Sequence, residues 1–481
     1  MSLLAVPLAL AIVAQDQLAL RAAPRESSAV LVQLAQGESL ELRGLRQDHV
    51  EVWDYRRERG GYVLAAGLRP VSLQAEAAPE LLAVLRFLRE QPGAEALGLA
   101  YAAAYLKAVP AAALTAEPFD ALGQIADRLA QRASRTQGSG STPAELQLAA
   151  QLEVAAGYGV QLQSLSQDGV MRVCYDGEAF RRVLAMPSAT AAQRARAALG
   201  LSRPDCLADT LRPHERLAQL QARAELLDQL DLQPVSETQR NRVRLRRAGL
   251  WAELAQQFQI RGDLQASAPE AARRALQALT ALNKAELADA DRADYSEAAL
   301  RVAASRWAAE SAAGASNSRL QLTELPADPA KPGQHCLALT DSSARVPGAA
   351  LLSACSYGAI WVNSAQFSPD GRAVALAVQP LAGWRELWLM QQTAAGWHLD
   401  VLPPSSEGPG LGYAEFAGWV PGGERLLLVR ESRSGSRFKR SFETIKRADL
   451  SVEKQAASPD LLPVFQRWAD PAWRRQTLSL R

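Results

Sequence analysis

The period of the hydrophobic residues changes twice along this chain, and that pattern limits the fold more than any other feature. Apolar and polar residues alternate from about residue 12 to 73, as in half-buried strands. From about 75 to 315 the apolar residues recur every three or four positions, as on one face of a helix. Alternation returns over residues 320–481. The sequence therefore predicts an α+β multidomain protein with a β-rich domain at each end and a helical region between them.

Length and charge limit the choice of partner. The chain has 481 residues, enough for roughly three domains, and 48% of them are hydrophobic, so a sizeable core can form. The formal net charge is only +2. A balance this close to neutral gives no reason to expect nucleic acid as a partner.

The first residues are similar to a secretory signal. Residues 3–14 (LLAVPLALAIVA) are apolar throughout but fall short of the roughly 20 residues that cross a membrane. Ala9-Leu10-Ala11 fits a signal-peptidase cleavage pattern, although no Lys or Arg precedes Arg21. We expect residues 1–11 to be the remnant of a signal peptide, with export and no integral membrane span. The alternative is a buried first strand of a cytosolic protein.

The cysteines favour the exported alternative. The chain contains four, and their positions favour pairing within separate domains, Cys174 with Cys206 and Cys336 with Cys355. Four buried free thiols are the alternative. Disulfides persist in oxidising compartments such as the periplasm, which is the location we expect. The chain has no C-x-x-C spacing and no paired histidines, so the sequence predicts no metal site.

The strands at the N-terminal end follow a recognisable order. Residues 18–24 (LALRAAP) form a short segment that ends in proline. Residues 30–44 (VLVQLAQGESLELRG) alternate on either side of Gly37, and residues 49–63 repeat the pattern with a glycine pair at the second bend. This order resembles the bacterial Src-homology-3-type domain of exported proteins, which implies a small β-barrel over residues 12–73 that binds a peptide or a cell-wall ligand.

Three aromatic residues of this domain are the candidate ligand-binding residues. Trp53, Tyr55 and Tyr62 could form an aromatic groove for a peptide. Alternatively they only cover a very small core. His49 stands where the family often has a tryptophan, so the specificity of the family does not carry over.

The middle region, residues 75–315, predicts antiparallel helices in a tetratricopeptide-like or irregular bundle arrangement. Apolar residues recur at helical spacing after Pro213, at Leu217, Leu220, Ala224 and Leu227. A Gly/Ser-rich linker at 134–143 divides the region. Five arginines between residues 240 and 247 are consistent with a solvated helix, or alternatively with a site for an anionic polymer.

The C-terminal region contains a repeated turn. Residues 364–378 (SAQFSPDGRAVALAV) contain an S-P-D-G turn, and residues 418–429 (GWVPGGERLLLV) repeat the pattern with P-G-G in its place. Both resemble the blade repeat of TolB-type β-propellers. A blade takes about 40 residues, so residues 320–481 predict an antiparallel sheet of incomplete blades. Phe367 and Trp419 precede the two turns and are both predicted to be buried.

Catalytic motifs are missing from the sequence. The chain has four histidines, no H-E-x-x-H and no G-x-S-x-G, and we expect no catalytic residue and no cofactor. Residues 203–209 (RPDCLAD) resemble the D-C-S-G motif of cell-wall cysteine peptidases but lack S-G. The sequence predicts a non-catalytic cell-envelope binding or scaffold protein whose partner is a protein or a cell-wall peptide. The alternative is a cell-wall cysteine peptidase with Cys206 as nucleophile. The whole chain resembles uncharacterised exported bacterial proteins of the same layout.

Overall fold

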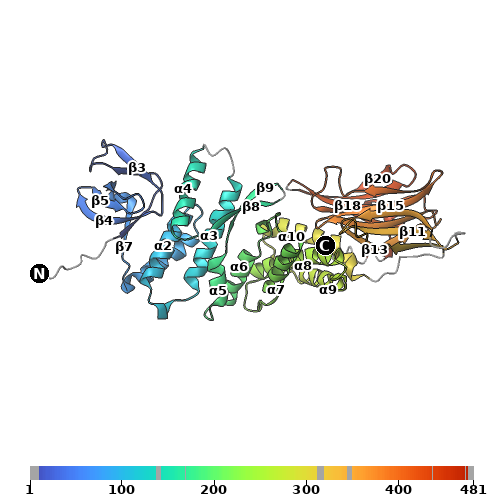
Figure 1. Ribbon diagram of the computed structural model, residues 1–481, viewed down its shortest axis with the longest axis horizontal. Helices are drawn as coiled ribbons and strands as arrows, with labels where there is room; N and C mark the ends of the chain where they lie inside the picture. Colours follow the sequence, from blue (N-terminus) through green and yellow to red (C-terminus); the bar gives the residue numbers. More distant parts are fainter. Residues whose placement is uncertain are drawn as a thin grey trace. The chain divides into compact units, whose positions relative to one another are not determined.

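The computed structural model describes residues 10–136, 142–167, 169–310, 319–343, 349–435, 437–471 and 473–474 (Figure 1). The chain divides into two compact units. The first comprises Met1–Arg216 and Leu230–Val235, and the second comprises Leu217–Gln229 and Ser236–Arg481. The helical middle is therefore shared between the two units. Residues 137–141 of the predicted linker lie outside the described residues, as do residues 1–9 of the predicted signal.

The first unit begins with one antiparallel sheet in the order β3-β2-β6-β5-β4-β1-β7. The inward-facing apolar residues of its strands form one core that includes Leu20, Leu40, Val52 and Val63, all at most 1% exposed. The strands are β1 (Leu10–Val13), β2 (Leu18–Arg21), β3 (Val30–Leu34), β4 (Ser39–Arg46), β5 (His49–Asp54), β6 (Arg59–Leu64) and β7 (Leu68–Val71).

The pairing corrects two expectations from the sequence, the hairpin at Gly37 and the closed barrel. The strands on either side of Gly37 do not form a hairpin, because β3 pairs with β2 whereas β4 pairs with β1 and β5. The described strands form an open sheet with β3 and β7 at its edges, not the closed barrel that we expected. Leu10 and Ala11 belong to β1, so cleavage after Ala11 would remove two residues of a paired strand.

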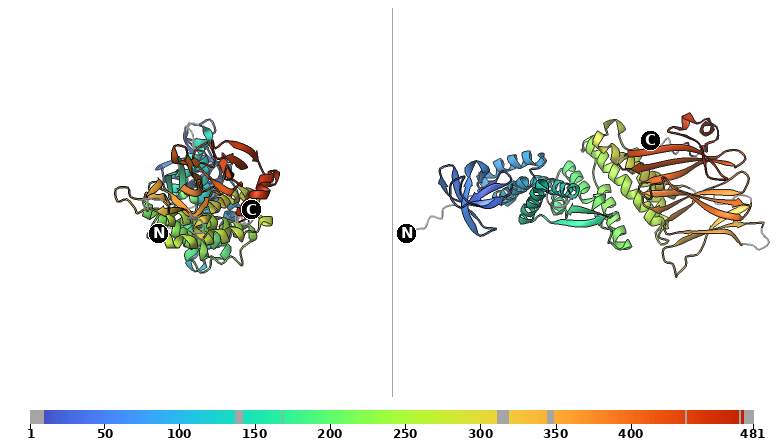
Figure 2. Two further views of the ribbon diagram at one scale, coloured as in Figure 1. Left: turned by 90° about the vertical axis from the view of Figure 1, so that its right-hand side faces the viewer. Right: turned by 90° about the horizontal axis from the view of Figure 1, so that it is seen from above.

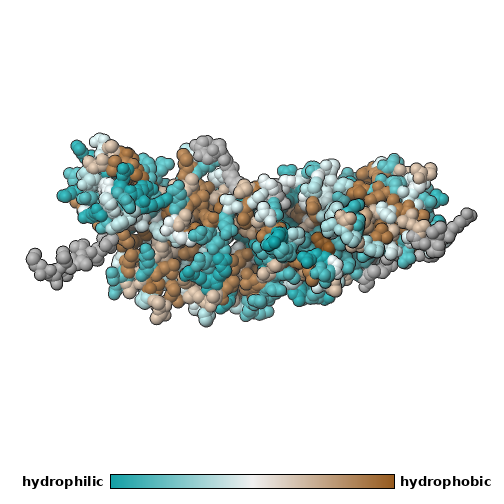
Figure 3. Space-filling view, in the orientation of Figure 1, coloured by the Kyte–Doolittle hydropathy of each residue, from teal (hydrophilic) through white to brown (hydrophobic). Residues whose placement is uncertain are grey.

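Helices follow the sheet in the first unit and are interrupted by one short hairpin, β8–β9, which the periodicity did not predict. Capping boxes at Thr142 and Thr190 fix the starts of α4 and α6. The elements are α1 (Ala78–Arg89), α2 (Glu95–Ala108), α3 (Glu117–Arg135), α4 (Pro143–Gly157), β8 (Leu162–Gln167), β9 (Val170–Tyr175), α5 (Glu178–Ala185) and α6 (Ala191–Leu201). In Figure 3 the helical part of the first unit shows more hydrophobic (brown) surface than the first sheet does.

Close contacts join the sheet of the first unit to its helices. Gly37 has φ +91°, and a Cβ built on it would lie 2.5 Å from the carbonyl oxygen of Ala96 in α2. Only glycine allows both this backbone conformation and this approach. The hydroxyl of Tyr158 donates to the carbonyl of Gly37 at 2.8 Å, and Arg57 bridges Glu38 and Asp54. The turn at Gly37 is therefore a packing contact with α2.

The second unit contains helices α8 (Glu237–Gln259), α9 (Ala268–Thr280) and α10 (Arg292–Ser305) and most of α7 (Pro213–Asp228). The four positions predicted to face the core of α7 are its buried residues. Ser236 occupies the N-cap of α8, but its side chain accepts no capping hydrogen bond. The 3₁₀ helix η8 (Arg306–Ala309) continues α10.

Three successive groups of strands complete the second unit (Figure 2). A three-stranded sheet comes first, followed by two four-stranded meanders that share only a short parallel pairing, Trp384 opposite Gly412 and Arg385 opposite Tyr413. The strands are β10 (Leu320–Glu324), β11 (His335–Asp341), β12 (Ala350–Ser356), β13 (Ala359–Phe367), β14 (Ala373–Leu381), β15 (Trp384–Thr393), β16 (Gly396–Leu402), β17 (Gly412–Trp419), β18 (Arg425–Ser434), β19 (Arg437–Lys446) and β20 (Val452–Ala456).

The three groups are stacked face to face. Val374 and Leu376 of β14 point to one side of the middle meander, into a core shared with β10, β11 and β12. Ala373 and Ala375 of the same strand point to the other side, into a core shared with β17, β18 and β19. This packing explains why β14 is buried along most of its length. Phe367 and Trp419 are only partly buried, which corrects the prediction that both would be buried.

The last meander has a second face, and helices cover it. Glu415 and Phe442 lie on this face, on β17 and β19. Glu415 forms an ion pair with Arg306 of η8. Phe442 meets Phe465 of α11 (Pro463–Trp468) with their ring centroids 5.6 Å apart. The architecture is therefore α+β, with an antiparallel sheet first, a helical middle, and a multi-stranded β region last. None of the helices in the described ranges has the length and apolar character needed to cross a membrane.

Candidate functional site

The outward face of the first sheet holds the three predicted aromatic residues. Trp53 lies on β5 opposite Glu41 of β4 and Gly60 of β6. Its ring has room because Gly60 has no side chain, and a Cβ there would stand 3.1 Å from the ring. The guanidinium of Arg43 lies 4.3 Å from the centre of the Trp53 ring, a cation–π contact.

Tyr55 belongs to the same cluster. Its hydroxyl shares a hydrogen bond with Glu41, which raises the pKa of Tyr55, and 58% of the residue is exposed. Glu41 also pairs with Arg43 at 3.2 Å. We name Glu41, Arg43, Trp53 and Tyr55 the outer-face cluster. The rings of Trp53 and Tyr55 therefore lie outside the core of the sheet, where Arg43 contacts the first and Glu41 the second.

Tyr62 lies on the same face but one step away. Tyr62 lies on β6, opposite Glu51 of β5, and Gly60, the partner of Trp53, lies two residues before it on β6. Residues two apart on a strand face the same side, so the Tyr62 side chain lies on the face that Trp53 occupies. Trp53 and Tyr62 are partly buried and do not belong to the hydrophobic core of the sheet. The structure therefore places the three predicted aromatics on one face, and Trp53 and Tyr55 share their partners.

The cysteines pair as the sequence predicted. Cys174 of β9 is bonded to Cys206, and Cys336 of β11 is bonded to Cys355 of β12 directly across the strand pair. No described cysteine is a free thiol. Asp205, beside Cys206, forms an ion pair with Arg203. With its sulfur in a disulfide, Cys206 has no thiolate available for nucleophilic attack.

The arginine run of α8 is used inside the second unit. Arg240 and Arg244 both pair with Glu237, and Arg242 pairs with Asp291 at 2.8 Å. Arg247 lies 3.3 Å from Asp228. Because four of the five arginines lie within ion-pair distance of neighbouring carboxylates, the run is consistent with the solvated helix.

A pocket that the sequence did not predict lies between α10 and the β18–β19 hairpin. Its volume is about 260 Å³. Ala299, Leu300 and Ala303 of α10 form an apolar floor, and the polar residues around them are Lys284, Tyr295, Ser296, Glu431 and Arg440. We name this the α10 pocket. It exists because α10 presents two alanines to the sheet, where larger side chains would fill the space.

Ion pairs hold the walls of the α10 pocket together. Arg433 of β18 donates to Glu297 of α10 at 2.9 Å, and Arg301 holds the other oxygen of Glu297 at 2.8 Å. The hydroxyl of Tyr413 donates to Glu431 at 3.1 Å. The Arg433–Glu297 pair thus joins the hairpin to α10, whereas the Tyr413–Glu431 hydrogen bond joins β17 to β18.

A buried charge cluster lies behind the floor. Arg385 is fully buried and donates from Nη1 to the carbonyl oxygen of Ala303 at 2.5 Å. Arg306 and Arg385 both face Glu415, so the three side chains carry one more positive than negative charge. Burial lowers the pKa of Arg385 to about 10, which still leaves the group charged at neutral pH. Sequence reasoning missed both the α10 pocket and this charge cluster, because their residues come from elements that are distant in the chain.

The comparisons with known proteins add no relative. No family model, no curated protein and no solved structure matches this chain. Among the described residues no group of His, Cys, Asp or Glu side chains is arranged to hold a metal ion.

Proposed function

We propose that this chain is a non-catalytic binding or scaffold protein of the bacterial cell envelope, which contacts a peptide or cell-wall ligand through its first sheet. The observation that carries this proposal is the position of Trp53, Tyr55 and Tyr62 on one outward face. Aromatic rings that are exposed on one edge and held by polar partners offer contact area at low entropic cost. Arg43 and Glu41 add charges that can pair with a polar ligand backbone.

Two further features support the resemblance of this sheet to Src-homology-3-type domains. The strands β4, β5 and β6 form a meander around one small core. A 3₁₀ turn, Ala65–Gly67, then leads into β7, which pairs back with β1. We regard the sheet as a partly opened version of the small barrel that the resemblance implies.

The C-terminal region fits the scaffold part of the proposal. Two consecutive four-stranded meanders, each with its turn between the first and second strand, support the resemblance to TolB-type blades. Apolar cores fill the space between the stacked sheets, and a packed scaffold of this kind can position surface loops for binding.

An envelope location is supported by the two disulfides. Each closes a loop inside one unit, with sequence separations of 32 and 19 residues. Bonds of this kind form and persist in the periplasm and are rare in the reducing cytosol. The pairing of Cys206 speaks against the alternative of a cysteine peptidase, which needs a free thiolate at that position.

The test is co-sedimentation of the purified full chain with protein-free cell-wall sacculi, compared with binding of a soluble stem peptide. We expect binding that falls at least tenfold when Trp53 and Tyr62 are both replaced by alanine. The matched control is Trp468→Ala, because Trp468 is 41% exposed but lies far along the chain on α11. Equal binding of the double variant and the control would contradict the proposal.

A further inference from the structure

We propose that the α10 pocket binds a small carboxylate with a short aliphatic body, such as the C-terminal residue of a peptide or a free short-chain acid. This site is independent of the first sheet and of the function proposed for it. The argument rests on the size, the lining and the charge of the pocket.

The size of the pocket limits the ligand. An apolar cavity of about 150 Å³ holds a benzene molecule, and pockets for drug-sized ligands start near 300 Å³. At about 260 Å³ the α10 pocket lies between these values. It therefore suits a body of a few carbon atoms with one polar group.

The lining separates an apolar end from a charged end. The methyl groups of Ala299 and Ala303, with Leu300, offer contact to an aliphatic group. Ala303 and Leu300 are at most 4% exposed, so this end excludes water when filled. Lys284 and Arg440 stand at the exposed end, and Tyr295 and Ser296 add hydroxyl groups there. A ligand that satisfies both ends has a short aliphatic body and a polar head.

The charge selects an anionic head. Neither Lys284 nor Arg440 forms an ion pair with a described residue; each lies against an aromatic ring, Tyr295 at 5.3 Å and Phe442 at 5.5 Å. Glu431, the cross-strand partner of Arg440, accepts from Tyr413. The side chains that line the pocket therefore carry one excess positive charge. The cluster of Arg306, Arg385 and Glu415 behind Ala303 adds a second.

A ligand with a carboxylate group should bind to Lys284 and Arg440 more tightly than a ligand with a cationic or a neutral polar group. Hydrogen bonds between a guanidinium or ammonium and a carboxylate are about twice as strong as neutral ones. A cationic ligand would find only Glu431, which Tyr413 already contacts. The excess of positive charge near the apolar floor would also repel it.

The experiment is isothermal titration of the full chain with three probes. They are N-acetyl-alanyl-valine, the same dipeptide with its C-terminus amidated, and isovalerate. We expect the free dipeptide to bind at least tenfold more tightly than the amide, because the amide lacks the charge that Lys284 and Arg440 meet. Isovalerate binding as tightly as the dipeptide would identify a free acid as the ligand, and weaker binding would identify a peptide terminus. Equal binding of acid and amide, or no binding of any probe at 10 mM (about 100 times a weak-site Kd of order 0.1 mM), would overturn the proposal.

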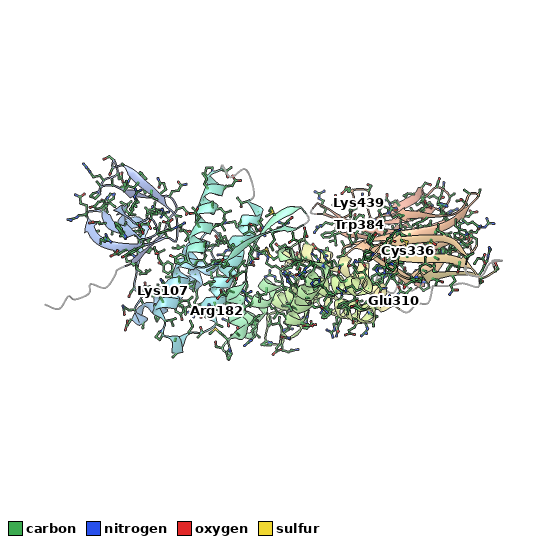
Figure 4. The ribbon with its side chains drawn as sticks, viewed as in Figure 1. Lys107, Arg182, Glu310, Cys336, Trp384 and Lys439 are labelled. Atoms are coloured by element: carbon green, nitrogen blue, oxygen red, sulfur yellow. A yellow bond between two sulfur atoms is a disulfide. The ribbon has the colours of Figure 1, made fainter. Side chains whose placement is uncertain are left out.

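Three variants locate the site. Ala299→Leu fills the floor and should abolish binding, and Arg440→Gln should weaken it about tenfold. Lys439→Gln is the matched control. Lys439, which is labelled in Figure 4, directly precedes Arg440 on β19, and successive side chains of a strand point to opposite faces. If Ala299→Leu fails to fold, Lys284→Gln combined with Arg440→Gln changes only exposed side chains and tests the same site. Unchanged affinity in that double variant, or an equal loss in Lys439→Gln, would place the ligand elsewhere.

Discussion

Arg447 donates two hydrogen bonds to Asp370, which lies 77 residues earlier in the chain, at 3.0 Å to Oδ1 and 2.7 Å to Oδ2. Asp370 belongs to the S-P-D-G turn between β13 and β14, whereas Arg447 follows β19 in the next meander. The turn of that meander is also close, since a Cβ on Gly423 would stand 3.0 Å from Asp370 Oδ1. One aspartate therefore closes its own turn and joins two stacked meanders.

Replacing Arg447 with glutamine should make the second unit less stable and change its response to acid. Burial by itself raises the pKa of Asp370, but hydrogen bonds from Arg447, Ser368 and the Arg372 N–H outweigh it and hold that pKa at about 2. The folded value lies below the unfolded value of about 3.9. The charged carboxylate therefore stabilises the fold above about pH 4, and this contribution is lost as the pH falls from about 4 to about 2.

We expect Arg447→Gln to lower the free energy of unfolding by about 1 kcal/mol at pH 7, after allowance for solvent screening. Between pH 4 and 2 the difference from the parent protein should shrink. Urea unfolding at a series of pH values measures both effects. Arg437→Gln, on the exposed start of β19, is the control. A difference that stays constant down to pH 2 would show that Arg447 acts through packing and not through Asp370.

Three tryptophans of the C-terminal region should respond to truncation in the order of their burial. Trp361 is 1% exposed, and its replacement by alanine should cost about 3–5 kcal/mol. Trp419 is half-buried, packs at a tilt against Phe416 with the ring centroids 5.0 Å apart, and donates to the Gln366 carbonyl, so we expect a loss of about 2–3 kcal/mol. Trp468→Ala should cost less than about 0.5 kcal/mol. Thermal unfolding of the three variants tests the order, and a neutral Trp419→Ala would contradict the packing described for it.

Gly37→Ala should loosen the first sheet by more than its backbone conformation alone explains. Gly37 and Gly408 share a φ of +91°, but a Cβ on Gly37 meets the Ala96 carbonyl whereas Gly408 has open space around it. We expect about 1 kcal/mol for Gly408→Ala from the positive φ, and at least twice that for Gly37→Ala. Hydrogen exchange of the amides near each glycine is the measurement, those of β1–β7 for Gly37→Ala and those of β17 and β18 for Gly408→Ala. Equal effects of the two substitutions would mean that α2 moves aside at no cost.

Peptide mapping without reductant should recover only the pairs Cys174–Cys206 and Cys336–Cys355, and the unfolded, unreduced protein should show no reactive thiol. Replacing either pair by serines should cost about 3–4 kcal/mol, because the cross-link restricts the unfolded chain. A peptide that joins cysteines of different units would contradict this connectivity.

The sequence predicted the elements better than their pairing. Leu217, Leu220, Ala224 and Leu227 define the buried face of α7, because helical periodicity is a local signal. Strands were correctly predicted on either side of Gly37, but they do not pair with each other. Strand pairing depends on residues that are distant in the chain, which a local pattern does not reveal. The β8–β9 hairpin was missed because it interrupts a helical region and, of its described residues, Cys174 alone is buried, so no alternating apolar pattern marks it.

The two candidate sites also differ in how far the sequence alone could predict them. Trp53, Tyr55 and Tyr62 lie within one short segment, so the alternation of β5 and β6 already indicated a common face. The α10 pocket depends on Lys284, Ala303 and Arg440, which come from a 3₁₀ helix, an α-helix and a strand. No local pattern joins such residues, and only the packing of α10 on the hairpin brings them together.

The helices that cover the outer face of the last meander determine how far the stack of sheets extends. A propeller limits its number of blades by closing into a ring. Here Arg306 and Phe465 occupy the side where another sheet would otherwise pack. The stack of sheets therefore ends at the last meander and does not close into a ring. An additional meander inserted after β20 would have to displace α11 before it could find an apolar face. The region should therefore tolerate longer loops between its strands far more readily than a change in the number of its sheets.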